Sequence, residues 1–204
     1  MTINTYANLK QAIENFSHRT DISNVIDNFI ELAENDIDKR LMLRNNELRA
    51  TATMSTTDRF LALPDRFLKM RRLTLINGSL NYEIEYRGSE SMPIQDSAGR
   101  PKYFTVTSQL EFDRVADSAY TLEMSYFSRL VPLTSSNTSN DVLTDYPDLY
   151  LWGCLTQLAL WEKDLEQFQV YQSKFDNAMS EANKQERKGR YGTAPRMIKE
   201  GSTP

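Results

Sequence analysis

Few side chains in this protein are of the kinds with which enzymes most often do chemistry. Among 204 residues there are one histidine, His18, one cysteine, Cys154, and seven glycines. Zinc sites need several thiolate or imidazole ligands, and phosphate-binding loops need closely spaced glycines. The inventory therefore predicts a structural or binding protein that uses no cofactor and no metal ion, and not an enzyme.

His18 and Asp21 come closest to an acid–base pair. An imidazole can act as a general base when a carboxylate orients it, but no Ser or Cys in a recognisable motif lies nearby to serve as the nucleophile. Cys154 lies between Gly153 and Leu155 in an apolar stretch, where a buried thiol is commoner than a reactive one. We expect structural roles for all of these residues.

Two groups of carboxylates could also carry chemistry. Asp141, Asp145 and Asp148 carry the oxygen ligands that a hard cation prefers, but the Gly and Glu of a calcium-binding loop are missing at the required offsets. Glu83 and Glu85 are two positions apart on a predicted strand, which puts them ~7 Å apart on one outward face without a cleft. We expect the aspartates to lie at helix entries and the glutamates to be solvated.

The segment from residue 59 to residue 72 mixes basic and aromatic residues, a pattern compatible with nucleic-acid binding. Asp58 and Asp65 interrupt it, and the net charge of the chain is −4. An acidic surface repels nucleic acid, so we favour a protein–protein or ordinary surface role and keep nucleic-acid binding as the alternative. The candidate contacts are Arg59, Arg66, Lys69, Arg71 and Arg72.

Charge is unevenly distributed along the chain. Residues 184–204 contain six basic and two acidic side chains, which leaves a net charge of −8 on the remainder. Two interpretations of this basic tail stay open: a solvated end, or an arm that becomes ordered on an acidic partner. Tyr191, Met197 and Ile198 could then be the apolar anchors.

Helical periodicity marks both ends of the chain. It predicts one helix over residues 6–17, capped by Thr5, and a longer one over residues 22–43. Near the other end it predicts a helix over residues 147–163, with Pro147 in the first turn, and a last helix that follows Asp164 as its cap. The apolar stripe of this last helix begins at Leu165.

Alternation with a period of two marks the middle of the chain. It predicts strands over residues 47–54, 70–76, 80–87, 103–107, 110–113 and 120–127, with an extended segment that ends at residue 64. Residues 65–68 are predicted to form a helical turn, and Asn77-Gly78 a type I′ hairpin turn. On the return strand Tyr82, Ile84 and Tyr86 are expected to share one face.

These elements predict an α+β fold: a helical bundle formed from the N- and C-terminal helices, with an inserted antiparallel β lobe. The expected divisions are N-terminal helices 1–45, β lobe 46–130, a mobile Ser/Thr/Asn-rich loop 131–145, C-terminal helices 146–190 and a tail 191–204. No apolar run approaches the ~20 residues of a membrane-spanning helix. A lone cysteine and an N-terminus without an apolar signal region favour synthesis in the cytoplasm.

Several short stretches, in order from residue 6 to Gly192, resemble the adaptor, or head-to-tail connector, proteins of tailed bacteriophages. The Ser/Thr/Asn-rich loop and the tail beyond Gly192 have no matching pattern. The stretches are Tyr6-Ala7-Asn8-Leu9-Lys10, Phe29-Ile30-Glu31-Leu32-Ala33-Glu34, Arg49-Ala50-Thr51-Ala52-Thr53, Leu61-Ala62-Leu63-Pro64, Phe67-Leu68-Lys69-Met70-Arg71, Gly99-Arg100-Pro101-Lys102-Tyr103-Phe104, Tyr120-Thr121-Leu122-Glu123-Met124 and Leu143-Thr144-Asp145-Tyr146-Pro147-Asp148-Leu149-Tyr150.

The resemblance implies a virion structural protein of the head–tail neck, made in the host cytoplasm, that acts in virion assembly and genome ejection. Twelve copies would form a ring below the portal and extend its DNA channel. The implied partners are the portal protein, neighbouring adaptor subunits, and a tail nozzle or other tail or fibre proteins. DNA would pass without specific binding, which suits an acidic body because neutralising many phosphates would hold the DNA.

In that family carboxy-terminal segments commonly contact the portal. The resemblance therefore assigns portal binding, as a hypothesis, to one set of residues near the C-terminus. These residues are Arg190, Tyr191, Arg196, Met197, Ile198 and Lys199.

Overall fold

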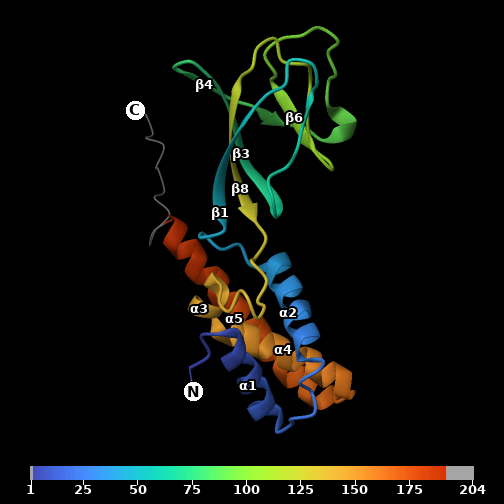
Figure 1. The fold of residues 1–204 in the computed structure, drawn as a ribbon, viewed down its shortest axis with the longest axis vertical. Coiled ribbons are helices and arrows are strands. Elements are labelled where there is room, and N and C mark those ends of the chain that lie inside the picture. Colours follow the sequence, from blue (N-terminus) through green and yellow to red (C-terminus); the bar gives the residue numbers. More distant parts are fainter. Residues whose placement is uncertain (1, 192–204) are drawn as a thin grey trace, which may run out of the picture. The chain divides into compact units, whose positions relative to one another are not determined.

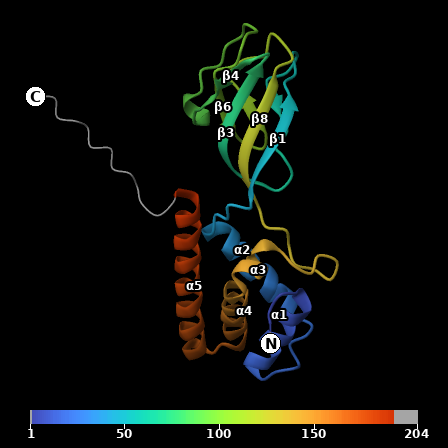
Figure 2. The same cartoon turned by 90° about the vertical axis from the view of Figure 1, so that its left-hand side faces the viewer.

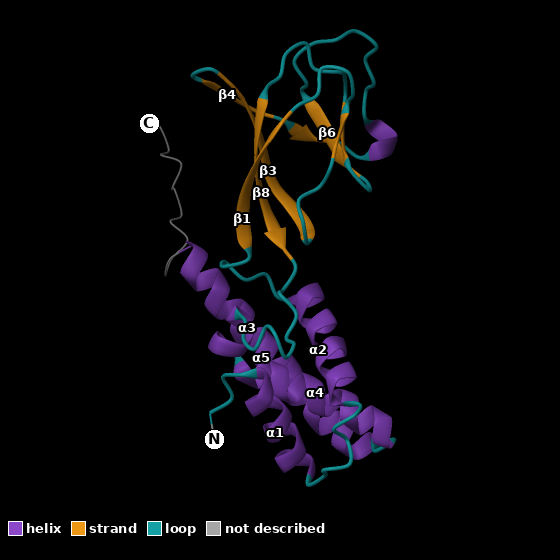
Figure 3. Cartoon of the chain, viewed as in Figure 1, coloured by secondary structure: helices purple, strands orange, loops and turns teal. Residues whose placement is uncertain are grey.

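The computed structural model describes residues 2–191, and for residues 190 and 191 the backbone alone. Its described part is an α+β protein with five α-helices and eight strands (Figure 1). Two compact units are present. One contains the chain up to Arg44 and from Leu130 onward, and the other contains Asn45–Arg129. The first unit is helical and the second is built from strands (Figure 3).

Local signals explain where the helices of the first unit begin. Thr5 Oγ1 accepts a hydrogen bond from the Asn8 amide, and Asp164 Oδ1 accepts one from the Gln167 amide. Pro147 occupies the first turn of its helix, where its missing N–H is not needed. The helices are α1 Tyr6–Ser17, α2 Ile26–Arg40, α3 Asp141–Asp145, α4 Pro147–Glu162 and α5 Leu165–Tyr191.

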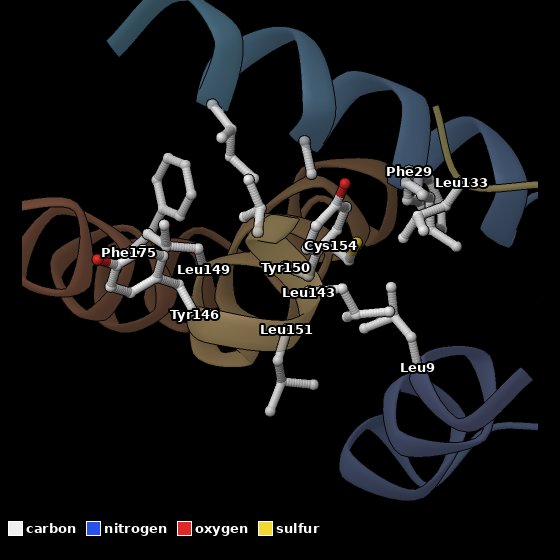
Figure 4. Packing of buried hydrophobic residues seen from close by; sticks show 14 of the residues in the cluster. Leu9, Phe29, Leu133, Leu143, Tyr146, Leu149, Tyr150, Leu151, Cys154 and Phe175 are labelled. Carbon is white, nitrogen blue, oxygen red and sulfur yellow. The ribbon is translucent and has the colours of Figure 1, made fainter. Parts of the chain in front are cut away.

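Helix α4 is at the centre of the helical unit. It packs against α1, α2, α3 and α5, and Figure 2 shows α4 and α5 side by side. Because α4 has partners around most of its circumference, it is apolar on nearly every side and not along one stripe. Its buried side chains include Leu149, Tyr150 and Cys154, which project into the core in Figure 4. Cys154 is fully buried, so its predicted burial is confirmed, and burial raises the pKa of its thiol.

Two details of the predicted helices are wrong. Helix α2 spans Ile26–Arg40 and not residues 22–43. Residues 21–25 form a separate turn before it, and the backbone of Leu41, directly after it, is extended. Leu165 is 69% exposed; as the first residue of α5 it does not reach the core that Phe175 and Met179 fill.

The β unit consists of two four-stranded sheets, with strand orders β1-β8-β3-β4 and β2-β7-β6-β5. All pairs among the described strands are antiparallel except β5 with β6, which is parallel and was not predicted. A separate hydrophobic core contains Leu73, Leu75, Leu122 and Phe112. The strands are β1 Glu47–Thr53, β2 Phe60–Leu61, β3 Phe67–Asn77, β4 Leu80–Glu83, β5 Glu85–Tyr86, β6 Tyr103–Val106, β7 Leu110–Phe112 and β8 Thr121–Ser128.

The predicted turns at both ends of β3 need correction. Residues 65–68 do not form a helical turn, because Arg66 has a positive φ of 53° and β3 begins at Phe67. In the hairpin, Asn77 pairs with Leu80, so the two central residues are Gly78 and Ser79. Of these only Gly78 has a positive φ, 61°, whereas a type I′ turn needs a positive φ at both central positions.

The predicted return strand over residues 80–87 is divided between the two sheets. Strand β4 pairs with β3, and after Ile84 the chain joins the other sheet as β5. Ile84 is buried, but Tyr86 is 62% exposed. The three residues of the predicted apolar face therefore do not share one environment.

Helix α3 lies within the segment 131–145, where a loop was predicted. Asn140 caps it by accepting a hydrogen bond from the Leu143 amide. The mobility of residues 131–140 stays a prediction. Within residues 2–191, no helix is both long enough and apolar enough to cross a membrane.

Candidate interaction surfaces

His18 and Asp21, the residues closest to an acid–base pair in the sequence, are both engaged in local structure. His18 ends α1 in the left-handed conformation, and its backbone N–H donates to the Glu14 carbonyl. Asp21 accepts hydrogen bonds at 2.8 and 2.5 Å from the Arg19 guanidinium, which lowers the pKa of its carboxyl. The histidine and the aspartate are thus held by different partners.

The carboxylate groups are also accounted for by local structure. Asp141 and Asp148 lie in the first turns of α3 and α4, where the helix dipole favours negative charge. The expectation of a helix entry is wrong for Asp145, which is the last residue of α3. Glu83 and Glu85 are exposed and lie on strands of different sheets. Within the described residues 2–191, no three His, Cys, Asp or Glu side chains are grouped so that they could hold a metal ion.

The basic segment of residues 59–72 forms ion pairs with carboxylates from other strands of the two sheets. Ion pairs join Arg59 to Glu111 at 3.1 Å and Arg71 to Glu47 at 2.9 Å. Arg66 lies in the turn before β3. These pairs reduce the positive potential that a DNA phosphate would meet. Nucleic-acid binding here stays a prediction, which the salt dependence of duplex binding would test.

Three of the five basic residues gather at a groove in the β unit. The groove has a volume of about 790 Å³, and Lys69, Arg71 and Arg72 line it together with Arg87. Its apolar lining includes the buried side chains Leu73, Ile84 and Phe104. The sequence gives no local sign of this groove, because it lies between strands of two different sheets.

Two buried glutamates of the helical unit, neither singled out by sequence reasoning, fix the segments that lead to and from the β unit. Glu34 Oε1 accepts hydrogen bonds from the Leu133 amide at 2.7 Å and from the Tyr150 hydroxyl at 2.9 Å. Glu186 accepts hydrogen bonds from the Arg44 amide at 2.8 Å and from the Tyr146 hydroxyl at 2.9 Å. Glu34 has a sequence signal, because the apolar residues Ile30 and Ile37 lie on the same face of its helix, whereas Glu186 lies in a polar run and has none.

The surroundings of the two buried glutamates raise two pKa values, that of Glu34 itself and that of Tyr146, which donates to Glu186. Burial raises the pKa of Glu34 despite its two hydrogen bonds, because desolvation disfavours the charged form. Burial and the bond to Glu186 raise the pKa of Tyr146 to about 12. These shifts come from burial and hydrogen bonding inside the helical unit.

The last turn of α5 lies next to Arg44. Gly189 is the reason that Arg44 can approach so closely, since a Cβ at this position would lie 2.6 Å from Arg44 Cζ. Of the predicted portal-binding residues, Arg190 and Tyr191 end α5. Arg196, Met197, Ile198 and Lys199 lie outside the described residues.

Aromatic side chains from three helices form a partly exposed row on the helical unit. Phe16 contacts Trp152 at 6.0 Å between ring centroids, and Trp152 stacks on Tyr171, also at 6.0 Å. Lys174 Nζ lies 5.0 Å from the Trp152 ring. Phe16 is 51% exposed, so this row presents apolar surface to its surroundings.

Comparison with known proteins identifies the family of this chain. One family model matches residues 4–197, which is nearly the whole chain. The match identifies the class: a phage adaptor, which is a structural component of the virion. The chain belongs to the SU10 adaptor protein family.

The resemblance to phage adaptors is thereby confirmed at the level of the family. The matched region extends to Met197, beyond Gly192, where the resembling stretches ended, and so it includes Arg196. A comparison with curated proteins gives no match.

Proposed function

We propose that this protein is the non-enzymatic adaptor that joins the phage portal to the tail. Twelve copies form a ring below the portal, extend its DNA channel and provide a platform for a tail nozzle or other tail or fibre proteins. The observation that carries this proposal is the family match over residues 4–197.

Exposed apolar side chains on the helical unit support ring formation. The row of Phe16, Trp152 and Tyr171 offers aromatic surface, and aromatic residues are enriched where proteins contact one another. Leu32 and Val170 add exposed aliphatic side chains on α2 and α5. A ring needs two different contact faces on each subunit, and this unit has apolar side chains on several helices.

Charge supports passage of DNA without specific binding. Without residues 184–204 the chain carries a net charge of −8. A lumen with few free cations releases few counterions from DNA and therefore does not retain it. The basic tail then supplies the contact with an acidic surface of the portal, through Arg190, Tyr191, Arg196, Met197, Ile198 and Lys199.

Electron microscopy of the protein mixed with its cognate portal tests this function. The full chain is expected to add ring density at the clip end of the portal, and a chain lacking residues 191–204 is expected to add none. A control variant with Lys39→Gln, Arg49→Gln and Lys102→Gln removes three cations outside the tail and should assemble normally. Absence of the ring with the full chain would overturn the adaptor role, whereas normal assembly of the shortened chain would overturn only the assignment of the tail.

A further inference from the structure

One half of β3 has a free edge. Strand β8 pairs with β3 along its length, but on the other side β4 pairs only with Thr74–Asn77. The Ile84 amide adds one more bond to the Leu73 carbonyl, at 3.0 Å. No described strand pairs with the outer side of residues 67–72. Six residues of strand span roughly 20 Å.

The groove described above runs along this free edge. After Ile84 the chain turns away from β3 and pairs with β6, so that β3 and β5 diverge and leave an opening between them. Apolar side chains that are at least half-buried form the floor: Met70, Leu73, Ile84, Phe104 and Val106. Exposed charged side chains form the rim: Lys69, Arg71, Arg72, Arg87, Glu83 and Glu85.

The chain itself shows what kind of segment fits this opening. One end of the groove is lined by the chain segment Glu83-Ile84-Glu85, in which the Ile84 side chain is 3% exposed. The flanking carboxylates point to rim cations, with Glu85 3.1 Å from Arg87 and Glu83 3.8 Å from Arg72. An apolar residue between two acidic residues therefore suits both the floor and the rim.

The charge of the rim selects among possible occupants. Of its four cations, Arg71, Arg72 and Arg87 are paired with Glu47, Glu83 and Glu85. Lys69 has no ion pair with any described residue, so it is the rim cation that a further carboxylate can reach. The tail of this chain, with Arg196 and Lys199 against Glu200, carries the same sign as the rim. Two register shifts in β3, at Leu68 and Arg71, together with the cations, discourage unspecific pairing of the edge. An acidic strand is the occupant that these charges favour.

We propose that the free edge of β3 at residues 67–72 is a docking site for an extended segment of another protein in which apolar and acidic residues alternate. The segment adds a strand to the sheet, its apolar side chains enter the groove, and a carboxylate faces Lys69. The inference rests on the proposed adaptor function only in that an adaptor has partner proteins.

A peptide-binding experiment with the full chain tests the proposal. The probe is a fluorescein-labelled, acetylated peptide of alternating Val and Glu between Thr residues. Control peptides have the same composition with Val and Glu in two blocks, or Lys in place of Glu. Fluorescence anisotropy should show the alternating acidic peptide binding about tenfold more tightly than either control. Only this peptide places Val side chains on the apolar floor and Glu side chains at the basic rim at the same time. Amide hydrogen exchange should slow at residues 67–72 when it binds.

Two matched variants complete the experiment. Lys69→Glu reverses an exposed rim charge and should weaken binding about fivefold, whereas Arg49→Glu makes the same charge change on β1, outside the groove, and should leave binding unchanged. Equal binding of all three peptides, no protection at residues 67–72, or no effect of Lys69→Glu would overturn the proposal. Self-association that Lys69→Glu abolishes would also overturn it, by assigning the groove to a second copy. No portal is involved, so these results are separate from the test of the adaptor function.

Discussion

The hydroxyl of Tyr150 donates a 2.9 Å hydrogen bond to Glu34 Oε1 inside the helical unit, although 116 positions separate the two residues. The same carboxylate oxygen accepts the amide of Leu133, and the Asn140 side-chain amide donates to the Tyr150 oxygen at 2.6 Å. Figure 4 shows the Tyr150 side chain extending from α4 into the core. These bonds join α2, α4 and residues 133–140, so the loss of one affects several elements.

Replacing Tyr150 by Phe should therefore be costly for a change of one oxygen atom. It leaves the Asn140 side-chain amide with the Val131 carbonyl as its remaining acceptor and Glu34 with one donor fewer. We expect the free energy of unfolding to fall by about 1–3 kcal/mol. Urea unfolding followed by circular dichroism measures this. The exposed Tyr86 provides the control, since Tyr86→Phe should change stability by less than about 0.5 kcal/mol. Equal effects of the two substitutions would contradict the assigned role of the Tyr150–Glu34 bond.

Glu34→Gln should change the pH dependence of stability. Burial raises the pKa of Glu34 above its ordinary value of 4.5. At a pH between the pKa of Glu34 in the unfolded chain and its pKa in the folded chain, the folded chain therefore binds more protons than the unfolded chain. The stabilisation that comes from this proton is complete below the unfolded pKa and is lost as the pH rises through the folded pKa. Gln keeps an oxygen acceptor for Leu133 and Tyr150 and has no proton to lose.

The variant should therefore gain stability relative to the native chain as the pH increases from about 4 to about 7. Urea unfolding of both proteins at several pH values gives the difference directly. Glu166→Gln, at an exposed position in the first turn of α5, is the control and should show a smaller trend. If the stability of the variant relative to the native chain stayed constant or fell with rising pH, the pKa of Glu34 would not be raised by its burial.

The sequence predicts those features that depend on neighbouring residues. Thr5, Pro147 and Asp164 mark the starts of helices because a cap or a first turn involves residues only a few positions apart. The alternation of apolar residues likewise predicts most strands, since side chains on a strand face opposite sides in turn.

Features that depend on distant partners are missed. The alternation through Tyr82, Ile84 and Tyr86 continues unbroken across the point where the chain changes sheets, so it cannot reveal the break between β4 and β5. The groove follows from that break and is missed with it. Glu34 is missed in the same way, because its burial depends on Tyr150, which belongs to another helix.

Two glycines within helices allow the same substitution to be compared in different surroundings. Gly153 is on α4, where a Cβ would lie 3.0 Å from the Ala33 Cβ and 3.2 Å from the Phe175 ring. Gly189 is on α5, where a Cβ would meet the guanidinium end of Arg44. The Arg44 side chain is 50% exposed and can move away, whereas Ala33 and Phe175 are buried in the packed core and cannot.

Gly153→Ala should therefore destabilise the protein by about 1–3 kcal/mol, since crowding in the core outweighs the better helix propensity of Ala. Gly189→Ala should be neutral or stabilising by up to about 1 kcal/mol, because the propensity gain offsets a weakened, half-exposed ion pair with Glu186. Thermal and urea unfolding of the two variants provide the comparison. Destabilisation by Gly189→Ala as large as that by Gly153→Ala would mean that the position of Arg44 beside α5 is held rigidly, and that its contact with Glu186 contributes more than its exposure implies.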